Sequence, residues 1–267
     1  MMPDEAQKVF FVEERQTNIK EYIDREKRVT VHELSQYFNV SPSTIRNDLT
    51  LLESEGLIHR THGGAVSINT IRVSEVKEPA EREETNSRFK NCIARMASKE
   101  VQDGDTIGIL GGSTSFTLVK ALTDKQHLTI VTNDLKIASW VDENTDFDLY
   151  VLGGFVKKKF HLMNILASRL ENINLDKVFF ASNGFDIAKG ATISDVNTAV
   201  AFRAVIGQSG RCIYMCDSSK IGNIAFAKIV DTADIDVFIT DANISSIAKK
   251  ALMEQEDLIL RIAEKED

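Results

Sequence analysis

Residues 40–65 read VSPSTIRNDLTLLESEGLIHRTHGGA, and this run decides the fold of the first part of the chain. Ser41 is a favoured N-cap, and Pro42 suits the first position of a helix, where a missing N–H costs nothing. The helix that they begin carries apolar residues at helical spacing, and Gly56 is expected to end it. Two short strand patterns follow, joined by a turn at Thr61–Gly64. The run therefore predicts a helix followed by a two-stranded wing.

The residues before this run predict two more helices. Thr30-Val-His-Glu33 is a capping box, in which the Thr hydroxyl and the Glu carboxylate satisfy each other's backbone N–H groups. The helix that it starts is expected to bury Val31, Leu34, Tyr37 and Phe38, and an earlier helix is indicated by Ile19, Tyr22 and Ile23. The order helix, helix, turn, helix, wing predicts a winged helix-turn-helix over residues 12–68.

The third of these helices carries a polar face that suits DNA. Short hydroxyl side chains, one amide and one guanidinium lie away from its apolar stripe, and such groups contact phosphates and base edges. The N-terminal residues of a recognition helix normally point at the bases, and the wing brings one arginine and one histidine. The predicted DNA-contacting residues are Ser41, Ser43, Thr44, Arg46, Asn47, Arg60, His62 and Gly63.

Charge does not decide between DNA and a protein partner for this unit. Between Glu13 and Ile68 the chain has seven basic and nine acidic residues, a net charge of −2. A winged helix used only for protein contacts therefore stays an alternative at this point. After it, residues 74–88 are rich in charge and contain Pro79, which predicts a linker or an exposed connecting helix. We expect a linker over residues 69–88 and a second domain over residues 89–267.

The second domain shows short apolar runs that alternate with helical segments. This pattern is typical of an α/β domain built around a largely parallel sheet. Strands are expected at Thr106–Leu110, Leu128–Val131, Leu149–Leu152, Lys177–Ala181, Cys212–Cys216 and Val237–Thr240, and helices at Phe116–Leu122, Lys136–Trp140, Thr198–Gln208 and Ser245–Met253.

Small polar residues and glycines follow each of the six expected strands, at the sheet edge where open parallel sheets bind ligands. The loop Gly111–Ser115 precedes a helix, so its N–H groups and hydroxyls suit a phosphate, and Lys220 is a candidate counter-charge. The loop lacks the Lys-Ser/Thr ending of a Walker motif and is not Gly-x-Gly-x-x-Gly, so no nucleotide cofactor is expected. With Asp186, Asp195 and Asp217 as candidate hydroxyl-binding groups, the pattern points to a small phosphorylated polyol.

At this point the chain resembles a known family, the DeoR-type bacterial transcriptional regulators. The resemblance rests on the run from Val40 to Ala65 together with Arg15, and it continues through Gly112-Ser-Thr114, Asn183-Gly184-x-Asp186 and Asp217-Ser-Ser-Lys220. It implies a sensor domain similar in fold to ribose-phosphate isomerases and CoA transferases, which in this family usually binds phosphorylated sugars. By resemblance, the effector-binding residues are Gly112, Ser113, Thr114, Asn133, Gly153, Gly154, Asn183, Gly184, Asp186, Asp217 and Lys220.

The chain departs from the family pattern at several positions. Asn47 stands where the family commonly has a second arginine. Leu110, Val200 and Phe202 stand where it often has Asp, Glu and Lys. These changes favour either a less polar ligand or an anion that is contacted by Lys157–Lys159 instead. The alternative interpretation of this lysine triplet is a solvent-exposed loop.

Composition excludes several other classes. Three cysteines, Cys92, Cys212 and Cys216, are too few for a disulfide framework, and the last two read as buried strand thiols. No cluster suggests a metal site, no apolar stretch is long enough to span a membrane, and the polar N-terminus is unlike a signal peptide. We therefore expect a cytoplasmic protein. Its net charge of −8, from 32 basic and 40 acidic residues, argues mildly against a chain coated in nucleic acid.

The function predicted from the sequence is a transcriptional regulator, most often a repressor in this family, that binds a double-stranded operator as a homodimer or homotetramer. The alternative is a sugar-phosphate isomerase-like enzyme with an appended helical domain. The second domain has only His127 and His161 as histidines, and no nucleophile–base constellation emerges. No enzymatic activity and no cofactor are therefore expected.

Overall fold

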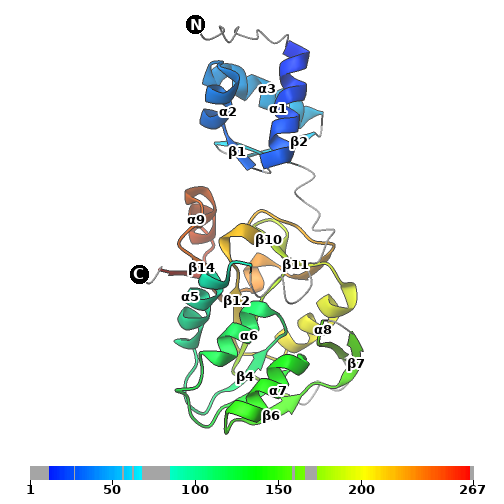
Figure 1. Ribbon diagram of the computed structural model, residues 1–267, viewed down its shortest axis with the longest axis vertical. Helices are drawn as coiled ribbons and strands as arrows, with labels where there is room; N and C mark the ends of the chain where they lie inside the picture. Colours follow the sequence, from blue (N-terminus) through cyan, green and yellow to red (C-terminus); the bar gives the residue numbers. More distant parts are fainter. Residues whose placement is uncertain are drawn as a thin grey trace, which may run out of the picture. The chain divides into compact units, whose positions relative to one another are not determined.

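The computed structural model describes residues 12–26, 28–55, 57–61, 63–67, 85–157, 160–165 and 173–264. The chain divides into two compact units, residues 1–72 and 73–267, which are considered separately here (Figure 1). Most of the predicted linker lies outside the described residues, as do Gly56 and His62. The boundaries drawn at residues 68 and 88 stay predictions.

The first unit is three helices and a small antiparallel sheet. Its helices are α1 (Val12–Glu26), α2 (Val31–Phe38) and α3 (Pro42–Ser54). Its sheet has the order β1-β3-β2, from β1 (Arg28–Thr30), β3 (Gly64–Ser67) and β2 (Ile58–Thr61). The predicted winged helix-turn-helix is therefore confirmed, and β1 is a strand that the sequence did not reveal.

The predicted caps of this unit are present. The Thr30 hydroxyl accepts a hydrogen bond from the Glu33 N–H at 3.1 Å, and the Thr30 N–H donates to the Glu33 carboxylate at 2.6 Å. The Ser41 hydroxyl accepts from the Thr44 N–H at 3.1 Å. These side chains satisfy N–H groups that the first turn of a helix leaves without a partner.

The prediction that Tyr37 of α2 is buried is wrong. Val31, Leu34 and Phe38 are buried, but Tyr37 is 59% exposed. A neighbouring residue in a helix is rotated by about 100°, so Tyr37 points away from the face that Phe38 fills. Its ring instead lies against Tyr22, with ring centroids 4.2 Å apart.

The second unit is built on a seven-stranded sheet whose neighbouring strands all pair in parallel. The strand order is β15-β14-β12-β9-β4-β5-β6. All six predicted strands are present in it, and the last strand along the chain adds a seventh. The strands are β4 (Thr106–Ile109), β5 (Thr129–Thr132), β6 (Asp148–Val151), β9 (Lys177–Phe180), β12 (Cys212–Met215), β14 (Val237–Asp241) and β15 (Ile259–Ala263).

Helices and smaller sheets surround this sheet. The four predicted helices are present as α6 (Ser113–Lys120), α7 (Leu135–Asn144), α8 (Val196–Ile206) and α9 (Ser246–Met253), and α5 (Ser87–Ser98) is additional. A hairpin joins β7 (Gly154–Lys157) to β8 (Leu162–Ile165), and a three-stranded sheet joins β10 (Gly184–Asp186), β11 (Gly190–Ile193) and β13 (Ala227–Val230). Short 3-10 turns, η3 (Ser218–Lys220) and η4 (Thr232–Asp234), complete the unit.

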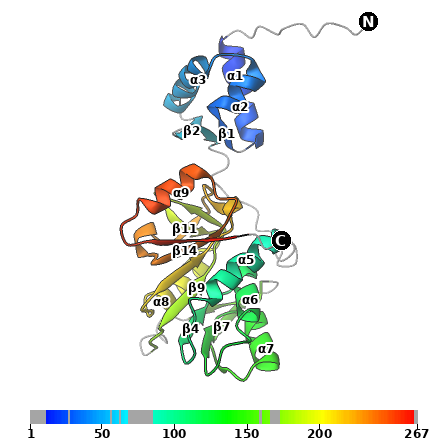
Figure 2. The same cartoon turned by 90° about the vertical axis from the view of Figure 1, so that its left-hand side faces the viewer.

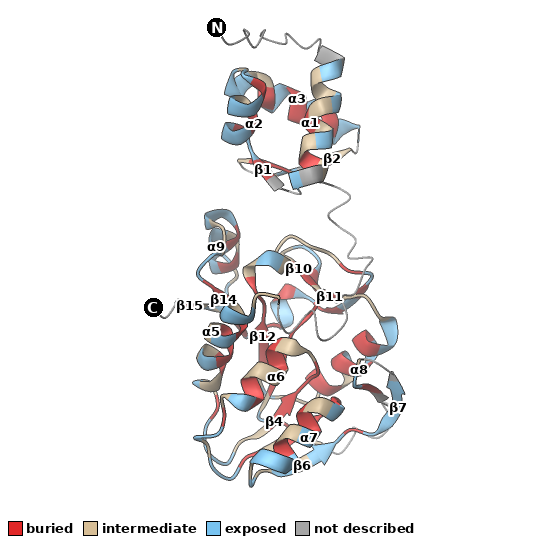
Figure 3. Cartoon of the chain, in the orientation of Figure 1, coloured by how far each residue is buried: buried red, intermediate tan, exposed pale blue. Residues whose placement is uncertain are grey.

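Two apolar cores lie on opposite faces of the large sheet. Successive strand residues alternate between them, so Phe179 and Ile213 join one core while Phe180 and Tyr214 join the other. Helices α5, α6 and α7 cover the first face, and α8 with β11 covers the second (Figure 2). The central strands are buried as a result, as Figure 3 shows. No helix in the described ranges is long and apolar enough to cross a membrane.

Candidate functional site

The first candidate site is the exposed face of α3. Ser41, Ser43, Arg46 and Asn47 are exposed there, and Thr44 is half-buried. The Ser41 hydroxyl lies 2.7 Å from that of Ser43 and 2.8 Å from that of Thr44. The predicted polar residues of this helix therefore form one accessible patch at its N-terminal end.

The wing strand β2 adds a cation to this patch. Arg60 donates from its guanidinium to the Thr50 hydroxyl at 2.7 Å, and Thr50 in turn donates to the Arg46 carbonyl at 2.7 Å. Both contacts are exposed, so the structure brings the two predicted arginines to the same side of the unit. Gly63 is half-buried, and its carbonyl accepts from the Val31 N–H at 2.7 Å.

The next glycine has a packing role. A Cβ on Gly64 would lie 1.9 Å from the carbonyl oxygen of Val29. No side chain fits this spacing, because β3 pairs with β1 at that position. The glycine that follows Gly63 is therefore required by the sheet, whether or not the wing contacts DNA.

A buried ion pair fixes α3 in place. Asp48 is 3% exposed and accepts from the Arg15 guanidinium at 2.7 and 3.1 Å, and from the Gln16 amide at 3.1 Å. The hydrogen bond with Asp48 raises the pKa of Arg15. Arg15 is thus a positioning residue for the recognition helix, since its charge already has a bidentate partner.

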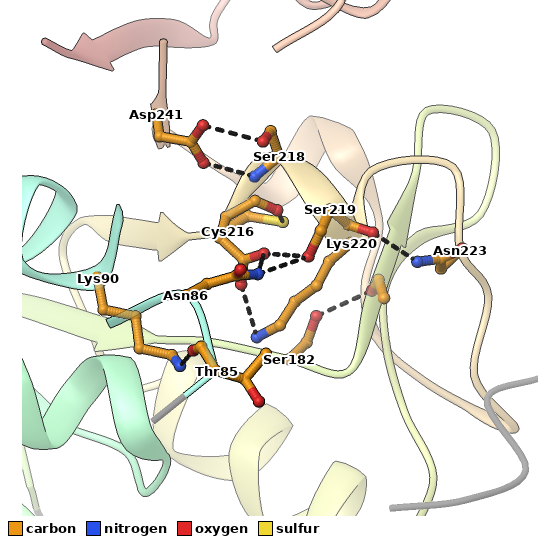
Figure 4. Close-up of polar contacts among 12 residues, drawn as sticks. Thr85, Asn86, Lys90, Ser182, Cys216, Ser218, Ser219, Lys220, Asn223 and Asp241 are labelled. Carbon is orange, nitrogen blue, oxygen red and sulfur yellow. Dashed lines mark hydrogen bonds and ion pairs between the residues drawn. The ribbon is translucent and has the colours of Figure 1, made fainter. Parts of the chain in front are cut away.

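The second candidate site is a cavity of about 260 Å³ at the carboxyl ends of β4, β9 and β12 (Figure 4). Six of the eleven predicted effector residues line it. These are Gly112, Ser113, Thr114, Asn183, Asp217 and Lys220. The other lining residues are Thr85, Asn86, Lys90, Gly111, Leu162, Ala181, Ser182, Ile193, Ser219 and Asn223.

The remaining predicted residues lie outside the cavity lining. Asn133 is buried behind it, where its Oδ1 accepts from the Gly111 N–H at 3.1 Å. Gly153 and Gly154 are exposed after β6. A Cβ on Gly184 would lie 2.4 Å from the Asn223 carbonyl, so this glycine lets a lining residue approach. Asp186 accepts from the N–H groups of residues 188 and 189, which closes the β10–β11 turn.

Of the other two candidate carboxylates, Asp195 caps α8. Its Oδ1 accepts from the Thr198 N–H at 2.7 Å and from the Thr198 hydroxyl at 2.6 Å. Asp217 is therefore the one proposed hydroxyl-binding carboxylate that the described structure places on the cavity.

The glycine loop shapes the cavity floor. A Cβ on Gly111 would lie 2.0 Å from Leu162 Cδ2 and 2.7 Å from an Asp134 oxygen, so a side chain at this position would require both neighbouring side chains to move. Gly112 has φ 148°, a conformation that favours glycine, and stands at the N-cap of α6 without a side-chain cap. The N–H groups that begin α6 thus have no capping side chain to which to donate.

A hydroxyl without a partner marks the same place. Thr114 is 1% exposed and lines the cavity, and its Oγ1 has no hydrogen-bond partner within the described structure, as is also true of the buried hydroxyls of Ser115 and Thr240, which do not line the cavity. Buried polar groups are nearly always hydrogen-bonded, so such a group calls for a ligand or a water. The N-terminus of α6 is therefore a candidate anion site.

Charged groups at the other wall favour an anion as well. Lys220 Nζ lies 3.5 Å from Asp217 Oδ2, and Lys90, which is 4% exposed, also lines the cavity. Burial by itself would raise the pKa of the Asp217 carboxyl, but Lys220, Ser219, Lys90 and Asn86 hold that pKa below its ordinary value. The carboxyl is charged near neutral pH, and two cations against one anion give the lining a net charge of +1.

Buried contacts behind η3 hold this wall. Asp241 accepts from the Ser218 N–H at 2.7 Å and from its hydroxyl at 2.9 Å. The Ser182 and Tyr214 hydroxyls lie 2.5 Å apart. The loops after β4, β9 and β12 therefore line the cavity, while Asn133 after β5 and Asp241 at the end of β14 support it.

The departures from the family pattern do not reach this cavity. Leu110 and Phe202 are fully buried in the apolar core, and Val200 is 43% exposed on α8. The side chains of Lys157–Lys159 lie outside the described residues. The apolar part of the lining comes instead from Leu162, Ala181 and Ile193.

Sequence reasoning missed Asn86, which lies inside the polar stretch interpreted as a linker, and Lys90, which lies just beyond that stretch. A signal was present for the lysine, because Lys90, Ile93, Ala94 and Ala97 recur at helical spacing and form the buried face of α5. A lysine on an apolar stripe indicates a buried charge with a partner. No group of three or more metal-ligating side chains occurs in the part of the chain that the structure describes.

Comparisons with known proteins fall on both units. A family model for the DeoR-like helix-turn-helix domain matches residues 15–71, and one for the DeoR C terminal sensor domain matches residues 85–242. The uncharacterized HTH-type transcriptional regulator YulB of Bacillus subtilis is 37% identical over 90% of this chain and 93% of its own length. The HTH-type transcriptional regulator GolR of Listeria innocua is 33% identical over 94% of this chain and 98% of its own length.

Among solved structures, ribose 5 phosphate isomerase A from Neisseria gonorrhoeae overlaps with a TM-score of 0.40 and 18% identity. The overlap covers 53% of this chain and 55% of the isomerase. A likeness this distant says nothing about activity.

Proposed function

This chain belongs to the DeoR family of DNA-binding transcriptional regulators, and from that premise we propose that it represses a sugar-metabolism operon until a small phosphorylated sugar fills the cavity of its second unit. The family inferred from the sequence motifs is thus confirmed. The relatives are regulators, so the chain is a regulator and not an isomerase.

The observation that carries the choice of effector is the Thr114 hydroxyl. It is buried without a partner at the uncapped start of α6, on a cavity that also presents Lys220 and Lys90. A phosphate bound there would accept from that hydroxyl and from N–H groups of the first turn of α6. The net charge of +1 of the lining supports an anion over a neutral sugar.

The rest of the lining supports a hydroxylated ligand. Asn183, Asn223 and Ser219 offer amide and hydroxyl groups near Asp217, which accepts hydrogen bonds when charged. A cavity of about 260 Å³ is just below the usual range for sites that hold drug-sized ligands. We therefore favour a metabolite the size of a sugar phosphate.

The exposed patch on α3 supports DNA as the partner of the first unit. Helix-turn-helix proteins place the N-terminal end of such a helix in the major groove and bind two half-sites as dimers. We propose that Ser43, Arg46 and Asn47 meet the groove and that Arg60 meets a phosphate. Two half-sites require at least a homodimer.

A thermal-shift panel tests the effector class. Glucose 6-phosphate, fructose 6-phosphate and glycerol 3-phosphate are compared with the matching unphosphorylated compounds and with inorganic phosphate. We expect stabilisation by phosphorylated compounds and weaker stabilisation by phosphate alone, because a ligand that binds only the folded state raises the melting temperature. Equal stabilisation by the free sugars would contradict an anion site.

A mobility-shift assay with DNA from upstream of the chain's own gene tests the regulator role. We expect retarded DNA that is released by the stabilising compound. Release by a compound that does not stabilise the protein would place the effector elsewhere.

A further inference from the structure

Two described residues near the end of the predicted linker (residues 69–88) are part of the cavity wall. Thr85 and Asn86 immediately precede α5 and line the cavity. The Asn86 amide donates to Asp217 Oδ1 at 3.2 Å and to the Ser219 hydroxyl at 3.1 Å (Figure 4). The Asn86 side chain, close to where the described part of the second unit begins, is thus hydrogen-bonded to residues of the candidate effector site.

The conformation of Asn86 shows that this contact replaces an ordinary one. Asn86 occupies the N-cap position of α5, where an asparagine side chain normally accepts from the first turn of the helix. It makes no such cap bond, and its backbone is left-handed, with φ 58° and ψ 31°. The amide reaches across to η3 and Asp217, more than 130 residues along the chain.

A second contact holds the same peptide from the other side. Lys90, one turn into α5, donates from Nζ to the Thr85 carbonyl oxygen. Lys90 lines the cavity and lies among the charges that act on the Asp217 carboxylate. The Thr85-Asn86 segment therefore bonds to a cation that would attract the phosphate of a ligand and to a carboxylate that would accept from its hydroxyl groups.

We propose that Asn86 is the positioning residue that couples the effector cavity to the DNA-binding unit. This rests on the proposed function in taking the cavity as the effector site. A ligand that hydrogen-bonds to Asp217 or Ser219 competes for the acceptors of the Asn86 amide, so the anchored segment and the filled cavity are alternatives. Ligand and operator then bind preferentially to different states of one two-state element, which is the condition for coupling.

The test compares three full-length variants with the wild type. Asn86→Gly removes the amide and keeps a residue that tolerates φ 58°. Asn86→Asp keeps the shape but places an acceptor against Asp217. His127→Gly is the matched control, because His127 is another left-handed position (φ 56°) in the same unit, is exposed, and does not line the cavity.

Three quantities are measured for each: the operator Kd without ligand, the Kd for inorganic phosphate and for glucose 6-phosphate, and the operator Kd with each of these two probes. Wild type and His127→Gly are expected to show operator affinity that falls about tenfold with a probe. Asn86→Gly and Asn86→Asp are expected to bind the operator about tenfold more weakly without any probe, and to respond to the probes by less than about twofold. Phosphate binding by Asn86→Gly should be retained and tightened by up to about tenfold, since the ligand no longer displaces the amide and the N-terminus of α6 is intact.

The outcomes separate the two proposals. If Asn86→Gly and Asn86→Asp match wild type in operator affinity and in response to the probes, the coupling role is wrong and the effector site stands. If neither probe binds wild type, yet the Asn86 variants alone lose operator affinity, the anchor stands and the phosphorylated effector is wrong. Loss of phosphate binding together with operator binding in Asn86→Gly indicates damage to the fold and counts against a coupling role.

Discussion

Replacing Lys220 by methionine is expected to weaken anion binding in the cavity about 30-fold. Methionine keeps most of the aliphatic stem and removes the charge, so the net charge of the lining falls from +1 to 0. Two unit charges 4 Å apart interact by about 4 kcal/mol at an effective dielectric constant of 20. The Lys220 side chain is 24% exposed, and water screening reduces this to about 2 kcal/mol, which corresponds to the 30-fold change.

Lys228→Met is the matched control for this prediction. Lys228 pairs with Asp231 at the same three-residue spacing as Lys220 with Asp217. The side chains of Lys228 and Asp231 are both about half exposed, however, and neither residue lines the cavity. Calorimetric titration with inorganic phosphate and glucose 6-phosphate should give the control a Kd within about twofold of wild type, since exposed pairs contribute little. The reasoning is refuted if Lys220→Met binds both anions like wild type, or if the control is weakened as much.

The same substitution changes how stability depends on pH. In the wild type the pKa of Asp217 lies below its ordinary value, so its stabilising effect is present above the unfolded pKa and is lost as pH falls through the folded pKa. Without Lys220, the effect of burial is opposed by fewer groups, and the pKa of Asp217 rises relative to wild type. The variant then loses free energy of unfolding at neutral pH and regains it relative to wild type as pH falls. Urea denaturation from pH 7 to pH 4 measures this difference, and a constant difference across the range would contradict it.

Three further predictions concern other parts of the chain. Arg46→Ala should weaken operator binding about tenfold, lower the slope of log affinity against log salt by about one, and leave the melting temperature unchanged, as measured by salt-dependent mobility shift and calorimetry. Asp48→Ala should cost about 3 kcal/mol of unfolding free energy in urea, because it leaves the Arg15 charge mostly buried without its partner; a loss below about 1 kcal/mol would contradict this. A thiol reagent at pH 8 should modify Cys92 in the native protein and spare Cys216, whose pKa is raised by burial to about 12; modification of Cys216 before unfolding would disprove the assignment.

The central strands of the large sheet were predictable because both of their faces are buried. A parallel strand that is buried on both faces reads as a continuous apolar run, as at Cys212–Met215, where every residue is buried. Two of the missed strands, β1 and β7, have no such pattern. β1 is three residues long and exists because Thr30 and Val29 pair with β3, and β7 pairs with β8 while presenting Phe155 to solvent at 79% exposure. Their partners define them, so local sequence does not reveal them.

The sequence predicted that loops at the carboxyl ends of the strands form the ligand site, but it did not predict which of these loops meet. The loops after β4, β9 and β12 converge because these strands are neighbours in the sheet, which the sequence alone did not specify. The loop after β6, at the edge of the sheet, carries the same kind of glycines, yet Gly153 is exposed and lies off the cavity. Glycine at a strand end therefore indicates a ligand site only where strand order brings the loop to the centre.

The departures from the family pattern had suggested a less polar ligand, and their positions argue against that reading. Leu110 replaces an acidic residue, but its side chain is fully buried in the apolar core and does not line the cavity. Phe202 packs in the same core. Both substitutions change packing behind the cavity, whereas Lys90, Lys220 and Asp217 determine its charge. Because ligand charge is selected by the groups that line a site, the lost polar residues leave the preference for an anion intact.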